Sequence, residues 1–387
     1  MRVMISCGEP SGDLYAGSLA TELRAREPGV EIFGLGGERL ASSGADVVAH
    51  YRDISVTGLT EALRVVPDSF RLLRTLTNEA TRRRPDVFVA VDFPDFNFRL
   101  MARLKKLGVP IVYYISPQLW AWRTGRMRTM QRQVSKVLVI FPFEEEIYRR
   151  AGVPVQFVGH PLVEMSTVSV ASFDRQAFRQ NLGLSTTAPA VALLPGSRQN
   201  ELSRHVPVLA GTIPLLAARV PDVEFVVARA PHLPDDLLMP LRQAALDCGR
   251  PLVTLRDATD AVLAGTDLAI TASGTATVQC AIHGRPMVVI YKLSTVSHAL
   301  LRPFVRVNAA AMPNLVAGSR IVPELIQGDC TPVRVAEETA SLLTDPARYA
   351  HMRDALIAVR EKLSLPGASG RAAAAVLETV RRPAQVA

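Results

Sequence analysis

Short runs of β-branched and other apolar residues recur along this chain, and each is followed by a cluster of Gly, Ser, Pro or Asn and then by a stretch of helix length. This alternation is typical of βα units, in which the strands lie parallel in one sheet and helices cover its faces. In the first half it predicts six strands, at residues 3–6, 31–34, 87–91, 111–115, 137–140 and 155–158. From about residue 165 to 189 the pattern lapses into polar residues around one short helical piece, which indicates a linker.

The alternation then restarts and predicts five more strands, at residues 191–194, 224–227, 252–255, 268–271 and 287–291, with a helical tail from Val333 to about Val380. The predicted fold class is therefore α/β, with two Rossmann-like, doubly wound parallel sheets and a helical tail. Two such domains that face a cleft form the GT-B architecture, whose ligands bind at the carboxyl ends of the strands. We expect these domains at 1–168 and 169–365, and a final helix at 366–387 that packs back on the first domain.

Length and composition fit this organisation. A chain of 387 residues exceeds what one hydrophobic core usually supports, and 48% apolar residues are ordinary for a folded protein. The net charge of +8 suits a phosphate-bearing substrate, a nucleic acid or an anionic membrane, and does not choose among them. Four widely spaced cysteines without a CxxC pair indicate a reducing cytosol and no zinc site. No apolar stretch approaches the roughly 20 residues of a membrane-spanning helix, so we expect any membrane contact to be peripheral.

The loop GEPSGD at residues 8–13 follows the first predicted strand and opens a helix. Its glycines would let the backbone approach a ligand, and the start of the helix offers N–H donors. We therefore include Glu9, Ser11 and Gly12 in the candidate site. A βα turn capped by Ser11 or Asp13 explains the same residues without a ligand.

The segment DFPDFN at residues 92–97 lies just past the third predicted strand, where its two carboxylates and its amide would converge at the top of the sheet. Flanking phenylalanines would lower the local dielectric and tune a carboxylate toward general-base chemistry, for which Asp95 is the candidate. Asp92 and Asn97 are further candidates; the alternative is that one aspartate caps the helix and the other lies on the surface. His160 either lines the cleft or is a satisfied structural histidine.

The segment at residues 113–122 contains both tryptophans of the chain. Aromatic rings gathered on one loop suggest a wall for a sugar ring or an acyl chain, and the following Arg123, Arg126 and Arg128 suit a phosphate. Packing of one tryptophan in the core is equally consistent with the pattern. The candidate residues in this loop are Ser116, Gln118, Trp120 and Trp122.

Two loops of the second half carry small and polar residues at predicted helix starts. Gly196, Ser197 and Arg198 follow the first strand, and Glu201 lies in the first helical turn. A small loop with an arginine at a helix start suits a diphosphate and the charge of a departing nucleotide. The alternative without a ligand is an arginine on a solvated turn.

The second of these loops, TASGTAT at residues 271–277, packs hydroxyls and backbone amides densely enough to cradle an anion. Its candidate residues are Ser273, Gly274 and Thr275. Gln279 follows one helical turn later, from which it could reach a ribose or a phosphate.

Eight segments of the sequence, in order, resemble the lipid-A-disaccharide synthase family: GEPSGD, DFPDFN, YYISPQLWAWR, FPFEEEIY, GHPL, LLPGSRQNE, TASGTAT and MPNLVAG. This resemblance spans Gly8 to Gly318 and implies an inverting transfer from UDP-2,3-diacylglucosamine to 2,3-diacylglucosamine 1-phosphate (lipid X), which releases UDP and forms a β(1→6) linkage. It further implies that Asp95 is the base, that Arg198 is needed for activity and that Asn314 lies at the nucleotide site. The family commonly has Glu where this chain has Gln279, so the contact with ribose is expected to be altered.

The resemblance also implies a peripheral enzyme on the cytosolic face of the inner membrane, with no cofactor, no metal and no nucleic-acid partner. A candidate membrane surface is a helical stripe whose apolar residues lie near Arg64, Arg71 and Arg74. A buried core helix would show the same spacing. The stripe consists of Leu59, Leu63, Val66, Phe70 and Leu73.

Two other classes of protein remain alternatives. One is a nucleotide-sugar epimerase or a GT-B transferase that acts on a soluble sugar. The other is a membrane-surface or RNA-binding scaffold, suggested by the positive charge and by the triple arginine at residues 82–84, although no RNA-binding motif accompanies it. The run GLGG at residues 34–37 resembles the start of a dinucleotide-binding motif, but Arg39 replaces its third glycine, which disfavours a nicotinamide enzyme.

Overall fold

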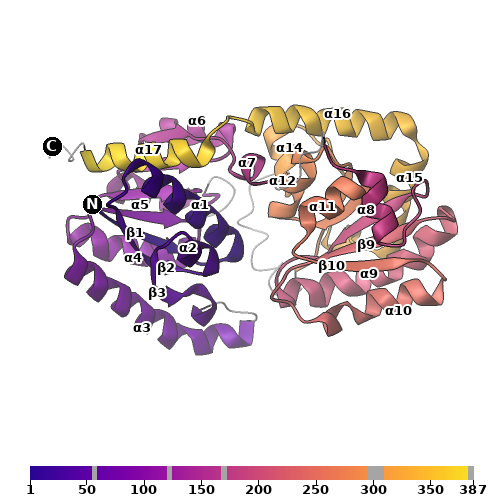
Figure 1. The fold of residues 1–387 in the computed structure, drawn as a ribbon, viewed down its shortest axis with the longest axis horizontal. Helices are drawn as coiled ribbons and strands as arrows, with labels where there is room; N and C mark the ends of the chain where they lie inside the picture. Colours follow the sequence, from indigo (N-terminus) through magenta and orange to yellow (C-terminus); the bar gives the residue numbers. More distant parts are fainter. Residues whose placement is uncertain (55–58, 120–123, 167–171, 294–308, 382–387) are drawn as a thin grey trace. The chain divides into compact units, whose positions relative to one another are not determined.

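The inner strands β4 (Val87–Val91) and β8 (Ala190–Leu194) are buried along their whole length, as expected for strands inside parallel sheets that are covered on both faces. They belong to two separate units in the computed structural model, which describes residues 1–54, 59–119, 124–166, 172–293 and 309–381. Unit 1 comprises Met1–Glu164 and Leu363–Ala387, and unit 2 comprises Met165–Lys362 (Figure 1).

The sheet of unit 1 has seven parallel strands in the order β3-β2-β1-β4-β5-β6-β7. The prediction of six strands was wrong by one, because it omitted β3. This strand lies at the edge of the sheet, where its residues are exposed or only half-buried and so lack the apolar signature of the inner strands. The strands are β1 (Arg2–Cys7), β2 (Glu31–Gly36), β3 (Asp46–His50), β4, β5 (Ile111–Tyr114), β6 (Lys136–Val139) and β7 (Val155–Phe157).

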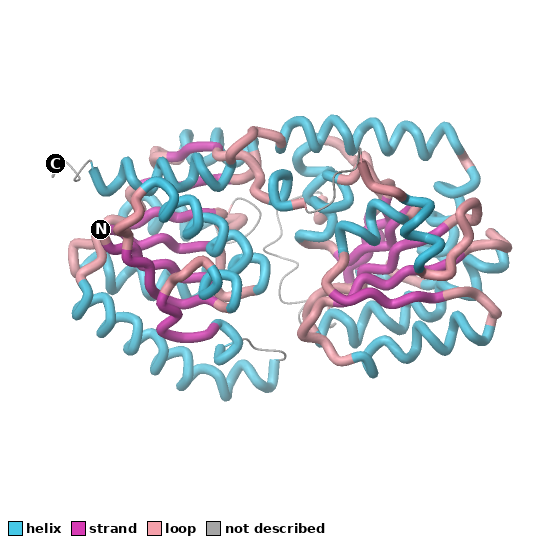
Figure 2. The backbone as a smooth tube through the Cα atoms, in the orientation of Figure 1, coloured by secondary structure: helices cyan, strands magenta, loops and turns pink. Residues whose placement is uncertain are grey.

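Helices cover both faces of this sheet (Figure 2). Alternate strand residues such as Met4, Phe88 and Tyr113 pack against α3, α4 and α5 in one core. On the opposite face α1 packs against α17, so the end of the chain returns to the unit in which it began. The helices are α1 (Pro10–Arg26), α2 (Glu38–Ser42), α3 (Leu59–Arg83), α4 (Pro94–Lys106), α5 (Met127–Gln133), α6 (Pro142–Arg150), α7 (Leu162–Met165) and α17 (Ala368–Arg381), with short 3₁₀ turns η1 (Tyr51–Ile54) and η2 (Thr124–Arg126).

The sheet of unit 2 has six parallel strands in the order β10-β9-β8-β11-β12-β13. Here too the prediction omitted an edge strand, β13, which has only three residues. The strands are β8, β9 (Glu224–Arg229), β10 (Leu252–Arg256), β11 (Leu268–Ala272), β12 (Met287–Tyr291) and β13 (Glu324–Ile326).

The helices of unit 2 include α8, which lies in the segment predicted to be a linker. The side chain of Arg179 on α8 is buried and pairs with Asp267, so this part of the segment is integral to the unit. The helices are α8 (Arg175–Asn181), α9 (Gln199–Arg219), α10 (Met239–Asp247), α11 (Thr259–Gly265), α12 (Thr275–Ile282), α14 (Met312–Ala317), α15 (Pro332–Thr344) and α16 (Pro346–Leu363), with 3₁₀ turns η3 (Asp235–Leu238) and η5 (Gln327–Asp329).

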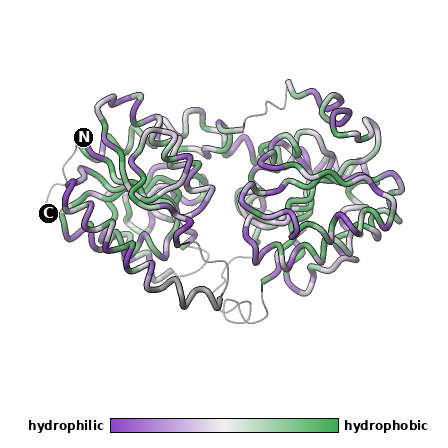
Figure 3. Tube along the Cα trace, turned by 60° about the horizontal axis from the view of Figure 1, so that its bottom comes forward, coloured by the Kyte–Doolittle hydropathy of each residue, from purple (hydrophilic) through white to green (hydrophobic). Residues whose placement is uncertain are grey.

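The strands of each unit form its apolar interior, and the polar residues gather on the surrounding helices and loops (Figure 3). Among the described helices, none is both long enough and apolar enough to cross a bilayer. In each sheet the strand order reverses direction beside the first strand of the unit, between β1 and β4 in unit 1 and between β8 and β11 in unit 2. Ligands of doubly wound sheets bind at the carboxyl ends of such strand pairs, so the loops that follow each pair contain the candidate site residues of that unit.

Candidate functional site

In unit 1 the loops after β1 and β4 interlock. A Cβ atom on Gly8 would lie 2.1 Å from Cγ of Phe93, so only glycine lets the two loops approach this closely. One layer below, the Ser6 hydroxyl donates a hydrogen bond of 2.6 Å to Oδ1 of Asn97, which is completely buried. The structure therefore brings the predicted segments 8–13 and 92–97 together.

The loop after β4 has an unusual backbone. Asp92 and Phe93 both adopt left-handed conformations, with φ values of 46° and 51°, which are uncommon for residues other than glycine. The carbonyl of Asp92 is held by two donors, Nδ2 of Asn97 and the hydroxyl of Tyr113, each at 2.8 Å. Asn97 is thus a buried clamp of the loop. Strain that surrounding contacts maintain in this way is typical of functional sites.

Asp95 lies in the first turn of α4, and its side chain is 63% exposed. Its Oδ1 atom accepts a hydrogen bond of 2.7 Å from Nη2 of Arg126. The guanidinium carbon of Arg126 lies 5.0 Å from the centre of the Phe98 ring, a cation–π distance. The expectation that phenylalanines desolvate Asp95 is therefore wrong: Phe93 and Phe96 stack on each other, while the carboxylate faces solvent and an arginine.

The loop after β1 is organised by Asp13, whose buried carboxylate accepts hydrogen bonds from the backbone amides of Gly37, Arg39 and Leu40 at 2.7, 2.9 and 3.2 Å. Asp13 therefore caps α2, whereas the sequence suggested that it caps its own helix. This cap occupies the amides that a dinucleotide phosphate would need at the GLGG run. Glu9 is the N-cap residue of α1, and Ser11 and Gly12 follow it in the first turn.

The loop after β5 begins at Ile115, a β-branched residue with a φ of 58°, which is a conformational outlier. The next residue, Ser116, is buried and forms a hydrogen bond with the hydroxyl of Tyr148. Gln118 is exposed beside it. Trp120 and Trp122 lie outside the described residues.

His160 is buried and packs edge-on against the rings of Phe141 and Tyr15, at centroid distances of 5.3 and 6.2 Å. Its Nδ1 atom accepts a hydrogen bond of 3.2 Å from the amide of Leu162. Burial lowers the pKa of His160 from 6.5 to about 3, which keeps the ring neutral. These contacts are those of a satisfied structural histidine.

In unit 2 the turn at residues 195–198 joins β8 to α9. Gly196 has a φ of 123°, and a Cβ atom there would lie 2.5 Å from Oε2 of Glu201. That oxygen accepts hydrogen bonds from the amides of Ser197 and Arg198 at 3.1 and 3.3 Å. Glu201 thus occupies two of the backbone amides at the start of this helix. The side chain of Arg198 is half exposed and pairs with the same carboxylate at 3.2 Å.

His205 supports the same turn from one helical turn further along α9, and the sequence did not single it out. Its buried ring lies between two backbone groups: Nδ1 is 2.7 Å from the carbonyl of Pro195, and Nε2 accepts a hydrogen bond of 3.1 Å from the amide of Lys292. Nδ1 must therefore carry the proton. Burial lowers the pKa of His205 and keeps it neutral. The signal that was missed is the i, i+4 spacing of Glu201 and His205, which places both side chains on one face of α9.

The loop after β11 leaves open space above the start of α12. Gly274 and Thr275 are exposed, and a Cβ atom on Gly274 would meet no described atom within 4 Å. The Ser273 hydroxyl, in contrast, donates a hydrogen bond of 2.9 Å to the carbonyl of Ala310 and so holds the segment before α14. Among the described residues, nothing crowds Gly274, and a helix start of this kind can bind an anion.

Gln279 lies one turn further along α12. Its Nε2 atom is 3.4 Å from Oδ1 of Asp260, and the same oxygen is 3.0 Å from Nε2 of the buried His283. A carboxylate accepts hydrogen bonds only, so Asp260 selects the orientation in which the Gln279 amide nitrogen faces it. The carbonyl oxygen of that amide then points elsewhere.

Asn314 on α14 is buried, and both atoms of its amide are engaged. Oδ1 accepts hydrogen bonds from the amides of Ile321 and Val322 at 2.8 and 2.9 Å, and Nδ2 donates to Oε1 of Glu324 at 2.8 Å. Glu324 in turn accepts from the amides of Ala310 and Ala311 at the start of α14. Asn314 is therefore joined to Ser273 through the Ala310 segment, and the role that this geometry supports is positioning.

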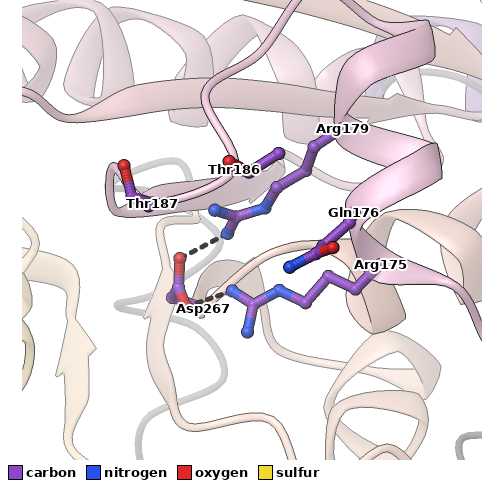
Figure 4. Close-up of a pocket in the computed structure, with 6 residues that line it drawn as sticks. All are labelled: Arg175, Gln176, Arg179, Thr186, Thr187 and Asp267. Atoms are coloured by element: carbon purple, nitrogen blue, oxygen red, sulfur yellow. Dashed lines mark hydrogen bonds and ion pairs between the residues drawn. The ribbon is translucent and has the colours of Figure 1, made fainter.

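A polar pocket of about 280 Å³ lies elsewhere on unit 2, beside the amino ends of the strands (Figure 4). Its charged groups are paired with one another: Arg175 and Arg179 both contact Asp267, which also accepts a hydrogen bond of 2.8 Å from the amide of Ala190. Burial alone would raise the pKa of Asp267, but these partners lower it overall. The charged groups of this pocket are already paired, so their role is structural: they join α8 to the residues that precede β11 and begin β8. It is lined by Arg175, Gln176, Arg179, Thr186, Thr187 and Asp267.

A family model and individual related proteins both match this chain over nearly its whole length. The family model described as lipid-A-disaccharide synthetase matches residues 3–377. The chain is 41% identical over 378 residues to a lipid-A-disaccharide synthase from Myxococcus xanthus (strain DK1622), covering 97% of each, and 43% identical over 380 residues to one from Anaeromyxobacter sp. (strain K), covering 98% of each.

Solved structures show the same fold at low sequence identity. The UDP-GlcNAc 2-epimerase of Neisseria meningitidis, bound to UDP-GlcNAc, superimposes with a TM-score of 0.72 at 12% identity, over 98% of this chain and 100% of that one. A glycosyltransferase from Rickettsia africae ESF-5 superimposes with a TM-score of 0.59 at 10% identity, over 100% and 99% of the two chains. The predicted class of two Rossmann-like parallel sheets with a helical tail, shared by GT-B transferases and nucleotide-sugar epimerases, is confirmed.

Proposed function

This chain belongs to the lipid-A-disaccharide synthase family, and on that premise we propose that it joins UDP-2,3-diacylglucosamine to 2,3-diacylglucosamine 1-phosphate with inversion at the donor carbon. The products are the lipid A disaccharide 1-phosphate and UDP. The observation that carries this proposal is the family match across residues 3–377, which includes every loop of the candidate site.

Asp95 serves as the general base in this proposal. Its exposed carboxylate takes the proton from the acceptor hydroxyl as that oxygen bonds to the anomeric carbon of the donor. The bond between the anomeric carbon and the diphosphate oxygen breaks in the same step, and its electron pair leaves with UDP. The strained backbone at Asp92 and Phe93 supports this role, because it fixes the start of α4 on which Asp95 lies.

The loops of unit 2 bind the nucleotide. Arg198 neutralises the charge that develops on the diphosphate, and Gly196 and Ser197 give it a close approach to the backbone. The open start of α12, with Ser273, Gly274 and Thr275, supplies further amide donors.

Gln279 and Asn314 contribute to binding of the uridine part of the nucleotide. Gln279 offers its carbonyl oxygen to one ribose hydroxyl, because Asp260 engages its nitrogen. Asn314 acts indirectly, since its amide is used to hold the segment that Ser273 contacts.

The acceptor binds to unit 1. Its polar groups contact Glu9, Ser11 and Gly12 after β1, and Ser116 and Gln118 after β5. Its sugar ring or acyl chains contact Trp120 and Trp122. His160 and Asn97 shape these loops from within the core.

Because both substrates carry acyl chains, the protein works at the cytosolic surface of a membrane. Phe70 on α3 is 51% exposed and lies beside Arg71 and Arg74, a combination that suits anionic headgroups. Leu73, on the same predicted stripe, is 3% exposed and packs in the core, so only part of the stripe is available. The side chains of Leu59, Leu63 and Val66 lie outside the described residues.

The test is incubation of the protein with UDP-2,3-diacylglucosamine and lipid X, followed by mass detection of the disaccharide. The fold likeness to UDP-GlcNAc 2-epimerase makes epimerisation the second candidate. It is tested by incubation with UDP-GlcNAc alone and analysis of the sugar stereochemistry. Appearance of the disaccharide in the first reaction and of no epimer in the second is the expected result. The reverse pattern would replace the transferase with an epimerase.

A further inference from the structure

One charged contact in unit 1 joins residues that are far apart in sequence. Arg126, in the short turn η2, reaches Asp95 at the start of α4, with Nη2 2.7 Å from Oδ1. The arginine side chain is 31% exposed and the aspartate side chain 63% exposed. Arg126 is thus the more enclosed partner.

Two features of the surrounding structure hold Arg126 in place. Its guanidinium lies over the ring of Phe98, three residues after Asp95 on α4, so the arginine spans two neighbouring side chains on one helix face. The segment that carries it is anchored by Met130 on α5, which is completely buried in the core of unit 1. An arginine that lies over a ring and next to a helix anchored in the core is preorganised for the carboxylate.

From this geometry we infer that Arg126 is a positioning residue for the transfer reaction: it fixes the rotamer of Asp95 and keeps its carboxylate ionised. This inference rests on the proposed function, in which Asp95 is the base. A carboxylate has two oxygens, so Oδ1 holds the guanidinium while Oδ2 accepts the proton from the acceptor hydroxyl. After the transfer step the proton leaves Oδ2 to solvent, and the ion pair is restored.

Other charged and titratable groups near this pair come from three elements. Asp92 precedes α4 in the same loop, and its negative charge opposes ionisation of a neighbouring carboxylate. Tyr113 of β5 and Tyr148 of α6 are buried in the core of the same unit, and burial raises the pKa of both tyrosines well above the usual range. Both therefore stay neutral near pH 7. Among the described residues, Arg126 is the positive group that the structure pairs with Asp95.

The test measures the pH profile of kcat/KM for the wild-type protein and for Arg126→Ala, Arg126→Met and Arg126→Lys. A nearby opposite charge lowers a carboxylate pKa by about 1–3 units, so its removal should move the acidic limb of the profile upward by about 1 pH unit. Activity of Arg126→Ala and Arg126→Met relative to the wild type should then fall up to ~10-fold on the acidic limb, at pH values below the pKa of Asp95, and approach the wild type at higher pH. Arg126→Lys, which keeps the charge, should retain a limb near that of the wild type. Arg126→Met preserves the bulk of the side chain in case the alanine variant does not fold.

Arg132→Ala is the matched control, because it removes a positive charge from α5, the helix that directly follows Arg126; its guanidinium contacts the carbonyl of Arg128 instead of Asp95. Asp95→Asn separates the two proposals. If Asp95→Asn is inactive while Arg126→Ala and Arg126→Met show an unshifted limb, the inference about Arg126 is refuted and the base assignment stands. If Asp95→Asn retains full activity, the base assignment itself is wrong.

Discussion

The carboxylate of Glu201 holds Arg198 twice: Oε1 accepts a hydrogen bond of 3.2 Å from its guanidinium, and Oε2 accepts one of 3.3 Å from its backbone amide. Loss of a helix cap costs about 1 kcal/mol, so we expect Glu201→Ala to stay folded but to loosen the turn. A loss of ~1.4 kcal/mol in donor binding corresponds to a tenfold weaker affinity. We therefore expect the KM for the UDP-sugar to rise ~10-fold, measured at saturating acceptor. The control variant Glu337→Ala removes an exposed partner of Arg219 and should leave the KM for the UDP-sugar unchanged.

Replacement of Arg198 tests the charge at the leaving group directly. Groups that stabilise charge in a transition state typically contribute about 10²–10³ in kcat, so Arg198→Ala should lose activity on that scale. Arg198→Lys should recover little, because a lysine lacks the planar fork that pairs with a diphosphate. Arg219→Ala, at the far end of α9, controls for general loss of positive charge. Full activity of Arg198→Ala would exclude it from the reaction.

His160 should make stability depend on pH. Its pKa is about 3 in the folded protein against 6.5 ordinarily. Between these values the unfolded chain binds a proton that the folded protein excludes, so the free energy of unfolding falls as pH falls from about 6.5, by at most ~1.4 kcal/mol per pH unit. Urea unfolding at pH 5 and 7.5 should show a smaller pH difference for His160→Gln than for the wild type. The exposed His351→Gln should match the wild type. His205 has a lowered pKa too, so some dependence remains.

The exposed ring of Phe70 predicts an effect on membrane association. Phe70→Ser removes an apolar side chain from the surface of α3, so binding to vesicles that contain anionic lipid should weaken while the thermal midpoint stays within a few degrees. Leu73→Ser is the contrasting variant. It places a hydroxyl in the core, where loss of a leucine alone costs about 2–5 kcal/mol, and should lower the thermal midpoint. Unchanged sedimentation of Phe70→Ser with vesicles would show that this face of α3 does not touch the membrane.

EDTA should leave the transfer rate intact. In the proposed scheme, arginine and the amides at the start of α12 carry the charge of the leaving diphosphate. The measurement compares initial rates with and without EDTA, and again after addition of magnesium. A sharp drop that magnesium restores would assign part of this role to a cation.

Sequence patterns predicted the inner strands and the loops that follow them, because buried parallel strands give continuous apolar runs that end in small and polar residues. They missed β3 and β13, which are only partly buried, whereas the other two edge strands, β7 and β10, were predicted from their apolar runs. The site loops were found for the same reason: Asp95, Arg198 and Ser273 all follow inner strands.

What the sequence could not predict is how these residues are held. The left-handed backbone at Asp92 depends on the hydroxyl of Tyr113, 21 positions away, and the pairing of Asp95 with Arg126 spans 31 positions. Asn314 matched a nucleotide-site residue by motif, yet its amide is engaged by the backbone at residues 321–322 and by Glu324. Contacts of this kind are set by tertiary packing, which leaves no local periodicity.

The return of α17 to unit 1 has a consequence for how the chain folds as it is synthesised. Ala372, Ala373 and Val376 of this helix are buried in unit 1, so α1 lacks its partner until residues 368–381 have emerged from the ribosome. Unit 2 is continuous in sequence and can fold as soon as residue 362 has emerged. The unit translated first is thus the last to complete its core, and for most of translation it presents an uncovered apolar face on which a chaperone could act.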